Sequence, residues 1–120
     1  AAREGEAQRA RGLLTEGLLL TRRRGAQAEI ADALWALAVF ATVEEMPTLA
    51  LRLVGAAEAH HTTIGNLLAP HRQEYYRRVL APAWAALGEE EGASARASGR
   101  SLSPDAAFAE ARVARLLLPE

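Results

Sequence analysis

Alanine and leucine dominate this chain, and their abundance constrains the fold more than any other feature. Of the 120 residues, 28 are Ala and 18 are Leu, whereas Val, Ile, Phe, Tyr and Trp are few. Ala and Leu are strong helix formers, while the β-branched and aromatic residues that favour strands are scarce. We therefore expect an all-α protein. Half of the residues are hydrophobic, which allows one small domain of this length to bury a modest core.

The charge balance excludes several classes of partner. The 14 basic residues are all Arg, and the 15 acidic residues leave a net charge of -1. Such a chain has no strong field that would attract nucleic acid or an anionic membrane. The absence of Cys excludes a disulfide framework and Cys-ligated zinc. The sequence contains no basic segment followed by an apolar core and a cleavage site, and no apolar run approaches the roughly 20 residues that span a bilayer. We expect a cytoplasmic chain with no membrane partner and no direct contact with nucleic acid.

Apolar spacing in the first half predicts three helices. They cover about residues 6–24, 27–44 and 47–64. The three arginines at 22–24 suit the last turn of a helix, and Gly25 suits its left-handed end. Pro47 suits the first turn of the third helix, which is expected to stop at Gly65 and Asn66. The second helix must be buried on more than one side, because Trp35 and Phe40 widen its apolar face.

The second half has clear start signals but one weak segment. A loop containing Pro70 precedes a fourth helix that ends at Gly88, and Pro82 predicts a kink or a helix start within it. Residues 89–100 offer little to bury, so we expect a short, loosely packed helix there. Residues 103–105, Ser-Pro-Asp, predict the N-terminus of the last helix, because Ser caps the helix and Pro suits its first position.

An internal repeat suggests how the helices are arranged. Four residues of the first helix match four of the third at an offset of 40: Ala10, Leu13, Leu14 and Gly17 correspond to Ala50, Leu53, Val54 and Ala57. Residues 34–57 also follow the large and small spacing of a tetratricopeptide unit. We therefore predict a tetratricopeptide-like helical-hairpin solenoid (an α-α superhelix) of about six helices, with hairpins in residues 1–68 and capping helices of the same domain in 69–120. The first helix would then expose an apolar face, because the first helix of its own unit is missing.

Several separated motifs resemble a known family. They are Pro47, Ala50, Arg52-Leu53, residues 55–59 (GAAEA), Glu74-Tyr75, residues 86–88 (ALG) and residues 99–103 (GRSLS). In this order they resemble the last part of the tetratricopeptide-like array of large bacterial LuxR-type and AfsR-type ATP-dependent transcriptional regulators. The resemblance implies an ATPase before the array, often a helix-turn-helix after it, and signal or partner recognition by the array itself. The chain departs from the family at Gly92 and Arg96, where relatives usually carry aromatics, so the resemblance does not predict how that helix docks.

Catalytic and metal-binding patterns are incomplete. The chain has neither a phosphate-binding glycine loop nor a basic recognition helix, so we expect it neither to hydrolyse ATP nor to read DNA by itself. Glu58 and His61 supply half of a helical di-metal pattern, and His71 with Glu74 repeats it only in reverse order. We therefore expect no metal and no cofactor. The acidic pair at 44–45 and the acidic triplet at 89–91 fit solvated helix ends better than catalytic carboxylates. We therefore expect that the chain is not an enzyme.

The histidines, tryptophans and arginines each favour a structural role. His60 is expected to be partly buried in the third helix, with His61 beside it at the surface. Trp35 and Trp84 are expected in the core. Two groups of arginines could form an anion-binding surface: those at 22–24, and those at 72, 77 and 78, which lie near Tyr75 and Tyr76 in the sequence. Helix capping and ion pairs to Glu explain both groups better.

The sequence predicts an interaction module rather than an enzyme. We expect a non-catalytic protein-interaction and signal-relay segment of a larger bacterial transcriptional regulator, whose partner is another protein or the flanking domains of the same chain. Five residues are candidates for the groove between hairpins: Trp35, Val39, Arg52, His60 and Tyr75. The alternative is a stand-alone helical module that binds a small apolar ligand or forms a homodimer through its N-terminal helix.

Overall fold

The described part of the chain, residues 2–119 of a computed structural model, consists of helices joined by turns and short loops. It contains seven helices and no strand, against the six or so helices expected from the sequence. In chain order these are α1 (Ala2–Arg24), α2 (Gln27–Val43), α3 (Pro47–Ile64), α4 (Pro70–Val79), α5 (Ala81–Leu87), α6 (Glu89–Gly99) and α7 (Pro104–Val113). The all-α prediction is therefore confirmed.

Most helix ends lie where local signals predict them. Gly25 and Gly65 adopt φ values of 64° and 69° at the ends of α1 and α3, a left-handed conformation that glycine adopts without strain. The Ser103 hydroxyl accepts a hydrogen bond of 3.1 Å from the Ala106 N–H and so caps α7. Pro82 stands in the first turn of α5, directly after α4 ends at Val79. Of the two outcomes that Pro82 allowed, a helix start is the one observed.

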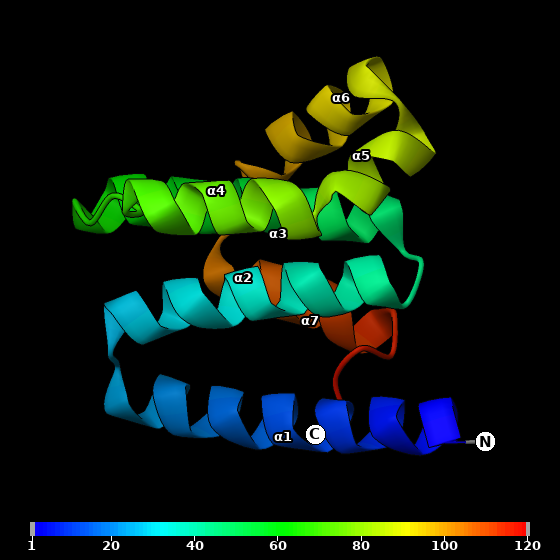
Figure 1. Cartoon of the computed structure of the whole chain (residues 1–120). Coiled ribbons are helices and arrows are strands. Elements are labelled where there is room, and N and C mark those ends of the chain that lie inside the picture. Colours follow the sequence, from blue (N-terminus) through cyan, green and yellow to red (C-terminus); the bar gives the residue numbers. More distant parts are fainter. Residues whose placement is uncertain (1, 120) are drawn as a thin grey trace.

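Helices α1, α2 and α3 lie side by side and alternate in direction (Figure 1). The middle helix, α2, is buried on several sides, as expected. Its buried residues are Ala31, Leu34, Trp35, Leu37, Ala38 and Ala41. The neighbouring α3 is the central helix of the molecule, because α2, α5, α6 and α7 all pack against it.

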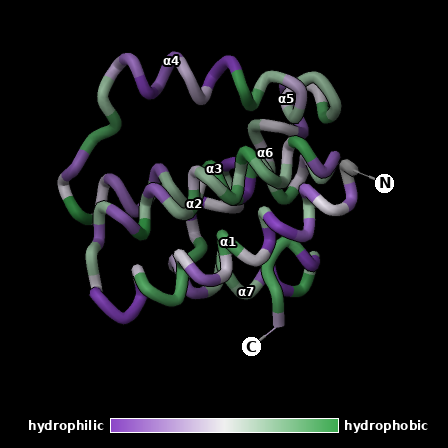
Figure 2. The backbone as a smooth tube through the Cα atoms, turned by 60° about the horizontal axis from the view of Figure 1, so that its bottom comes forward, coloured by the Kyte–Doolittle hydropathy of each residue, from purple (hydrophilic) through white to green (hydrophobic). Residues whose placement is uncertain are grey.

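The C-terminal helices gather around α3 instead of extending the row. α6 packs on α3 across from α2, and α7 returns to contact both α2 and α3 (Figure 1). The described residues measure 33 × 33 × 26 Å along their principal axes. This shape is a compact globule, and no solenoid or tetratricopeptide repeat is identified in it. Figure 2 shows α4 as a largely hydrophilic helix at the edge, which agrees with its lack of buried residues.

The loose packing predicted for residues 89–100 is wrong. A Cβ atom built on Gly55 would lie 2.0 Å from the Arg96 carbonyl oxygen, and one built on Gly99 would lie 2.0 Å from the Arg52 carbonyl oxygen. Only glycine permits this approach, so the backbones of α3 and α6 touch at two places. α6 buries its small residues because its backbone lies directly against that of α3. Close packing here does not require large apolar side chains.

The sequence predicts no segment that spans a membrane. Within the described chain, none of the helices combines the length and the apolar character that crossing a bilayer requires.

Candidate functional site

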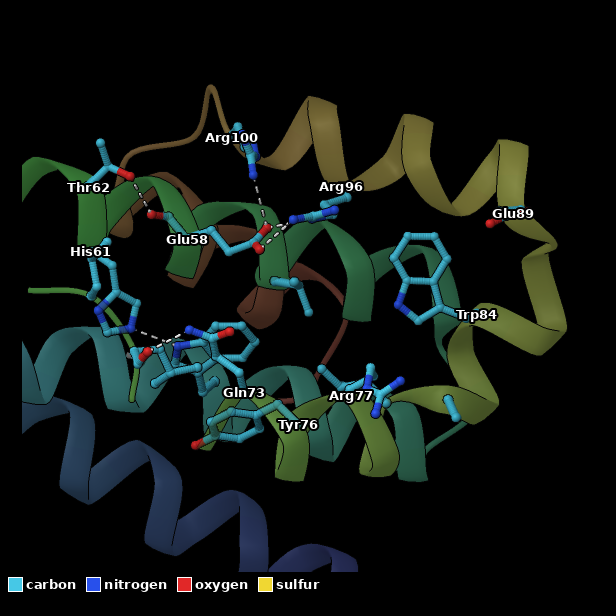
Figure 3. Close-up of a pocket in the computed structure, with 16 residues that line it drawn as sticks. Glu58, His61, Thr62, Gln73, Tyr76, Arg77, Trp84, Glu89, Arg96 and Arg100 are labelled. Atoms are coloured by element: carbon cyan, nitrogen blue, oxygen red, sulfur yellow. Dashed lines mark hydrogen bonds and ion pairs between the residues drawn. The ribbon is translucent and has the colours of Figure 1, made fainter. Parts of the chain in front are cut away.

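A groove of about 920 Å³ opens between α3, α4, α5 and α6 (Figure 3). Trp35 of α2 and Val54 of α3 contribute apolar surface to it, as do Leu80 and Trp84 near α5. Polar side chains line two opposite walls, one from α3 and α6 and the other from α4. The groove therefore combines an apolar interior with charged sides, the usual composition of a small-ligand site.

Trp35 is held at the base of the groove by two contacts. Its indole ring stacks on the Tyr76 ring, with centroids 4.5 Å apart and planes inclined by 13°. Its Nε1–H donates a hydrogen bond of 2.9 Å to Nε2 of His61. The indole is thus buried and orientated by one helix on each side, α4 through Tyr76 and α3 through His61.

The hydrogen bonds of His61 select one tautomer of its ring. An indole N–H only donates, so Nε2 of His61 must accept and the ring proton must sit on Nδ1. That Nδ1–H donates to the carbonyl oxygen of Asn66 in the turn after α3. The surface position predicted for His61 is wrong, because the side chain is buried between Trp35 and this turn.

A charged cluster forms the α3–α6 wall. Arg96 donates through Nε and Nη2 to the two carboxylate oxygens of Glu58, each at 2.6 Å. These bonds to Glu58 raise the pKa of Arg96 above its ordinary value. Nη2 of Arg100 lies 3.6 Å from the same carboxylate, an ion pair longer than a hydrogen bond. Two guanidinium groups therefore share one carboxylate at this wall.

The α4 wall carries a second set of arginines. Arg72 lies over the Tyr76 ring, 5.7 Å from its centroid, and donates a hydrogen bond of 2.9 Å to Asp32 of α2. The bond to Asp32 is the main cause that raises the pKa of Arg72. Arg77 lines the groove and pairs with Glu74 one turn earlier on α4. The ion pair to Glu predicted for these arginines is present at Arg77, whereas the partner of Arg72 is Asp32.

Two of the five predicted site residues lie near the groove. Trp35 lines it, as described above. Tyr75 is exposed on α4. Its ring centroid lies 5.2 Å from that of Tyr76, with the planes inclined by 71°, and the Arg78 guanidinium lies 6.0 Å from the Tyr75 centroid. It does not line the groove, but it adjoins the Trp35–Tyr76 stack.

The other three predicted residues lie elsewhere. Val39 is half-buried against the core. His60 is buried, and its Nε2 is 3.2 Å from the carbonyl oxygen of Gln27, which links α3 to the start of α2. Arg52 donates two hydrogen bonds, of 2.8 and 2.7 Å, to Glu110 of α7, beside a shallow hollow of about 480 Å³. This pairing lowers the pKa of Glu110.

Sequence reasoning missed the residues that give the groove its character. Trp84 was expected in the core, and Arg96 was noted only as a departure from a family pattern. The signal that could have indicated the place of Trp84 is Gly92, which is buried on α6. A Cβ atom there would lie 2.5 Å from Cε3 of Trp84, so the glycine makes room for the indole ring. Among the described side chains, no group of three or more His, Asp or Glu converges as a metal site would require.

Comparison with protein-family models, with curated proteins and with solved structures found no match for this chain. The geometry of the molecule is therefore the basis for assigning it a role.

Proposed function

We propose that this chain is a non-catalytic interaction and signal-relay segment of a larger bacterial transcriptional regulator, built on tetratricopeptide-like hairpins. Two observations support the proposal. α1, α2 and α3 are antiparallel neighbours, as successive helices of such hairpins are. In addition, the 40-residue offset in the sequence relates α1 to α3.

The observation that carries the proposal is a difference in burial between equivalent positions. Leu13 of α1 is 63% exposed, whereas Leu53, its equivalent in α3, is 0% exposed. Leu20 is 57% exposed, whereas the equivalent His60 is 7% exposed. The side chains of α3 are covered because helices pack around it, while α1 packs mainly against α2. α1 thus exposes an apolar face, whereas the equivalent face of α3 is buried.

The occupant we assign to this face is a helix from the flanking part of the same polypeptide. The reason is the repeat itself, since the equivalent face of α3 is covered by helices of its own chain. A docked helix would transmit a change of position along the row α1, α2, α3 to the groove at α3 and α6. Coupling between flanking domains would then arise from rigid packing of neighbouring helices.

Hydrogen exchange on α1 tests the proposal. The exchange of α1 amides is compared between the 120-residue chain and the full-length polypeptide of its reading frame, together with Leu13→Gln and Leu20→Gln. We expect slower α1 exchange in the full-length protein, and loss of this protection in both variants. Val113→Gln is the matched control, because Val113 is an exposed apolar residue that belongs to α7 and not to α1. All three substitutions should change the stability of the 120-residue chain by no more than about 0.5 kcal/mol.

Two results would contradict the proposal. One is a reading frame confined to these 120 residues, with a chain that stays monomeric and whose α1 amides exchange freely. The other is a homodimer that Leu13→Gln dissociates, because the face would then serve a second copy of the chain, as in the alternative function.

A further inference from the structure

We infer that the groove between α3, α4, α5 and α6 binds a small organic carboxylate, a compound with an apolar body and one anionic group. The inference rests on the proposed function and deepens it, because it names the chemical class of the signal that the segment would recognise.

The size and interior of the groove fit a small apolar molecule. Its volume of about 920 Å³ lies within the roughly 300–1,000 Å³ of small-ligand sites. The bodies of Val54, Leu80 and Trp84 would contact the ligand along its length. Leu67, in the loop after α3, lines the groove yet is 79% exposed. A bound apolar body would remove this side chain from water, which favours binding.

The charges on the wall select an anion. Both oxygens of Glu58 already accept hydrogen bonds from Arg96, so this carboxylate is neutralised without Arg100. The guanidinium of Arg100 is 55% exposed in its side chain and stands beyond hydrogen-bond distance from Glu58. Part of this guanidinium is therefore accessible to solvent beside the groove. A ligand carboxylate would form charge-assisted hydrogen bonds with it, which are stronger than bonds between neutral groups.

The remaining charges of the lining do not oppose an anion at Arg100. Arg77 also lines the groove, and Glu74 on the same helix balances its charge. Glu89 is the second acidic residue of the lining, and it lies at the start of α6 beside Trp84, apart from Arg100 (Figure 3). A cationic ligand would meet two guanidinium groups at the α3–α6 wall. A neutral ligand could accept a hydrogen bond from Arg100 but would not compensate its charge.

Calorimetric titration with three matched amphiphiles tests the inference. The probes are dodecanoate, dodecanol and dodecylamine, each below the concentration at which it aggregates, at one fixed ionic strength. They share an apolar chain and differ in the head group. We expect saturable one-to-one binding of dodecanoate, about tenfold tighter than that of dodecanol, with dodecylamine weakest. Equal affinity for dodecanoate and dodecanol, or no saturable binding of dodecanoate, would overturn the inference.

Substitutions locate the binding. Arg100→Gln should remove the tenfold preference for dodecanoate over dodecanol, and Leu67→Ser should weaken both ligands alike. Arg78→Gln is the matched control, because it removes the same charge from an exposed arginine of α4 that does not line the groove. A preference that survives Arg100→Gln, or that Arg78→Gln removes equally, would contradict a site at this wall.

The outcomes separate this inference from the proposed function. Carboxylate binding with an uncovered α1 would retain the groove as a ligand site and remove the relay role. A covered α1 without carboxylate binding would retain the interaction segment and overturn the ligand class assigned here.

Discussion

At the scale of single residues, His61 shows how one side chain joins three parts of the fold. Its two ring nitrogens bond to Trp35 of α2 and to the Asn66 turn, and the ring itself belongs to α3. Both partners have fixed roles, because an indole N–H only donates and a carbonyl oxygen only accepts. Trp35 in turn supports Tyr76, whose ring lines the groove. The shape of the groove base therefore depends on a buried hydrogen bond.

His61→Phe should destabilise the protein by about 1–3 kcal/mol, because it leaves the buried N–H of Trp35 without an acceptor. Urea unfolding followed by tryptophan fluorescence measures the loss. His71→Phe makes the same change at an exposed histidine of α4 and should stay within about 0.5 kcal/mol of the unsubstituted protein. Equal effects of the two substitutions would show that the bond to Trp35 contributes nothing specific.

At the scale of helices, the crossing of α3 and α6 is set by glycine. Gly55 meets the backbone of Arg96, and Gly99 meets the backbone of Arg52, so each helix supplies the gap that the other fills. The Glu58–Arg96 pair then spans the same two helices. Close backbone approach and a bidentate ion pair together hold one wall of the groove in place.

Gly99→Ala should destabilise the protein by about 3 kcal/mol or more. The added methyl group would meet the backbone of Arg52 at 2.0 Å, and backbone cannot move aside as a flexible side chain can. Gly17→Ala is the matched control in α1, because nothing lies within 4 Å of a Cβ there. The control should stabilise by up to about 1 kcal/mol through helix propensity. Thermal unfolding distinguishes the two, and similar stabilisation by both would refute the close crossing.

The helices themselves were more predictable from sequence than their docking. Gly25, Pro47 and the cap at Ser103 act on their own neighbours, so their effects are visible in a few consecutive residues. The packing of α6 was missed because its glycines act on a helix about 40 residues away. The apolar periodicity of a helix predicts which of its faces is buried, but not which helix it packs against or how closely.

The groove was predictable only in part for the same reason. Trp35 was a candidate because it was expected in the groove between hairpins, and it does line the groove that the structure contains. Arg96 and Arg100 could not be identified from their neighbours, because both pair with Glu58, which lies 38 residues before Arg96 in the chain. His61 was misjudged because alternation of buried and exposed positions does not reveal a turn that folds back on the ring, as the Asn66 carbonyl does.

At the scale of the whole molecule, α3 and α1 have opposite positions. α3 is surrounded, whereas α1 lies at the edge and packs mainly against α2. Two polar contacts join α1 to the C-terminal tail. Arg11 donates to the Arg115 carbonyl oxygen at 2.7 Å, and the Leu118 N–H donates to the Thr15 hydroxyl at 3.0 Å. Arg11 also donates to Glu44, at the end of α2, at 3.1 Å. Edge helices with few partners open at lower free energy than central ones.

Native-state hydrogen exchange should therefore divide the isolated chain into two levels. The α3 amides should exchange at the free energy of global unfolding, and the α1 amides at a lower value. Arg11→Gln should lower the opening free energy of α1 by about 1 kcal/mol without changing that of α3. The substitution removes the hydrogen bonds from α1 to Glu44 and to the Arg115 carbonyl oxygen, and neither partner belongs to α3. Arg9→Gln makes the same change at an exposed position of the same helix and should leave both levels unchanged. If α1 and α3 exchange together and Arg11→Gln lowers both equally, α1 is an integral part of one cooperative unit, and a separate role for it as a docking helix loses its physical basis.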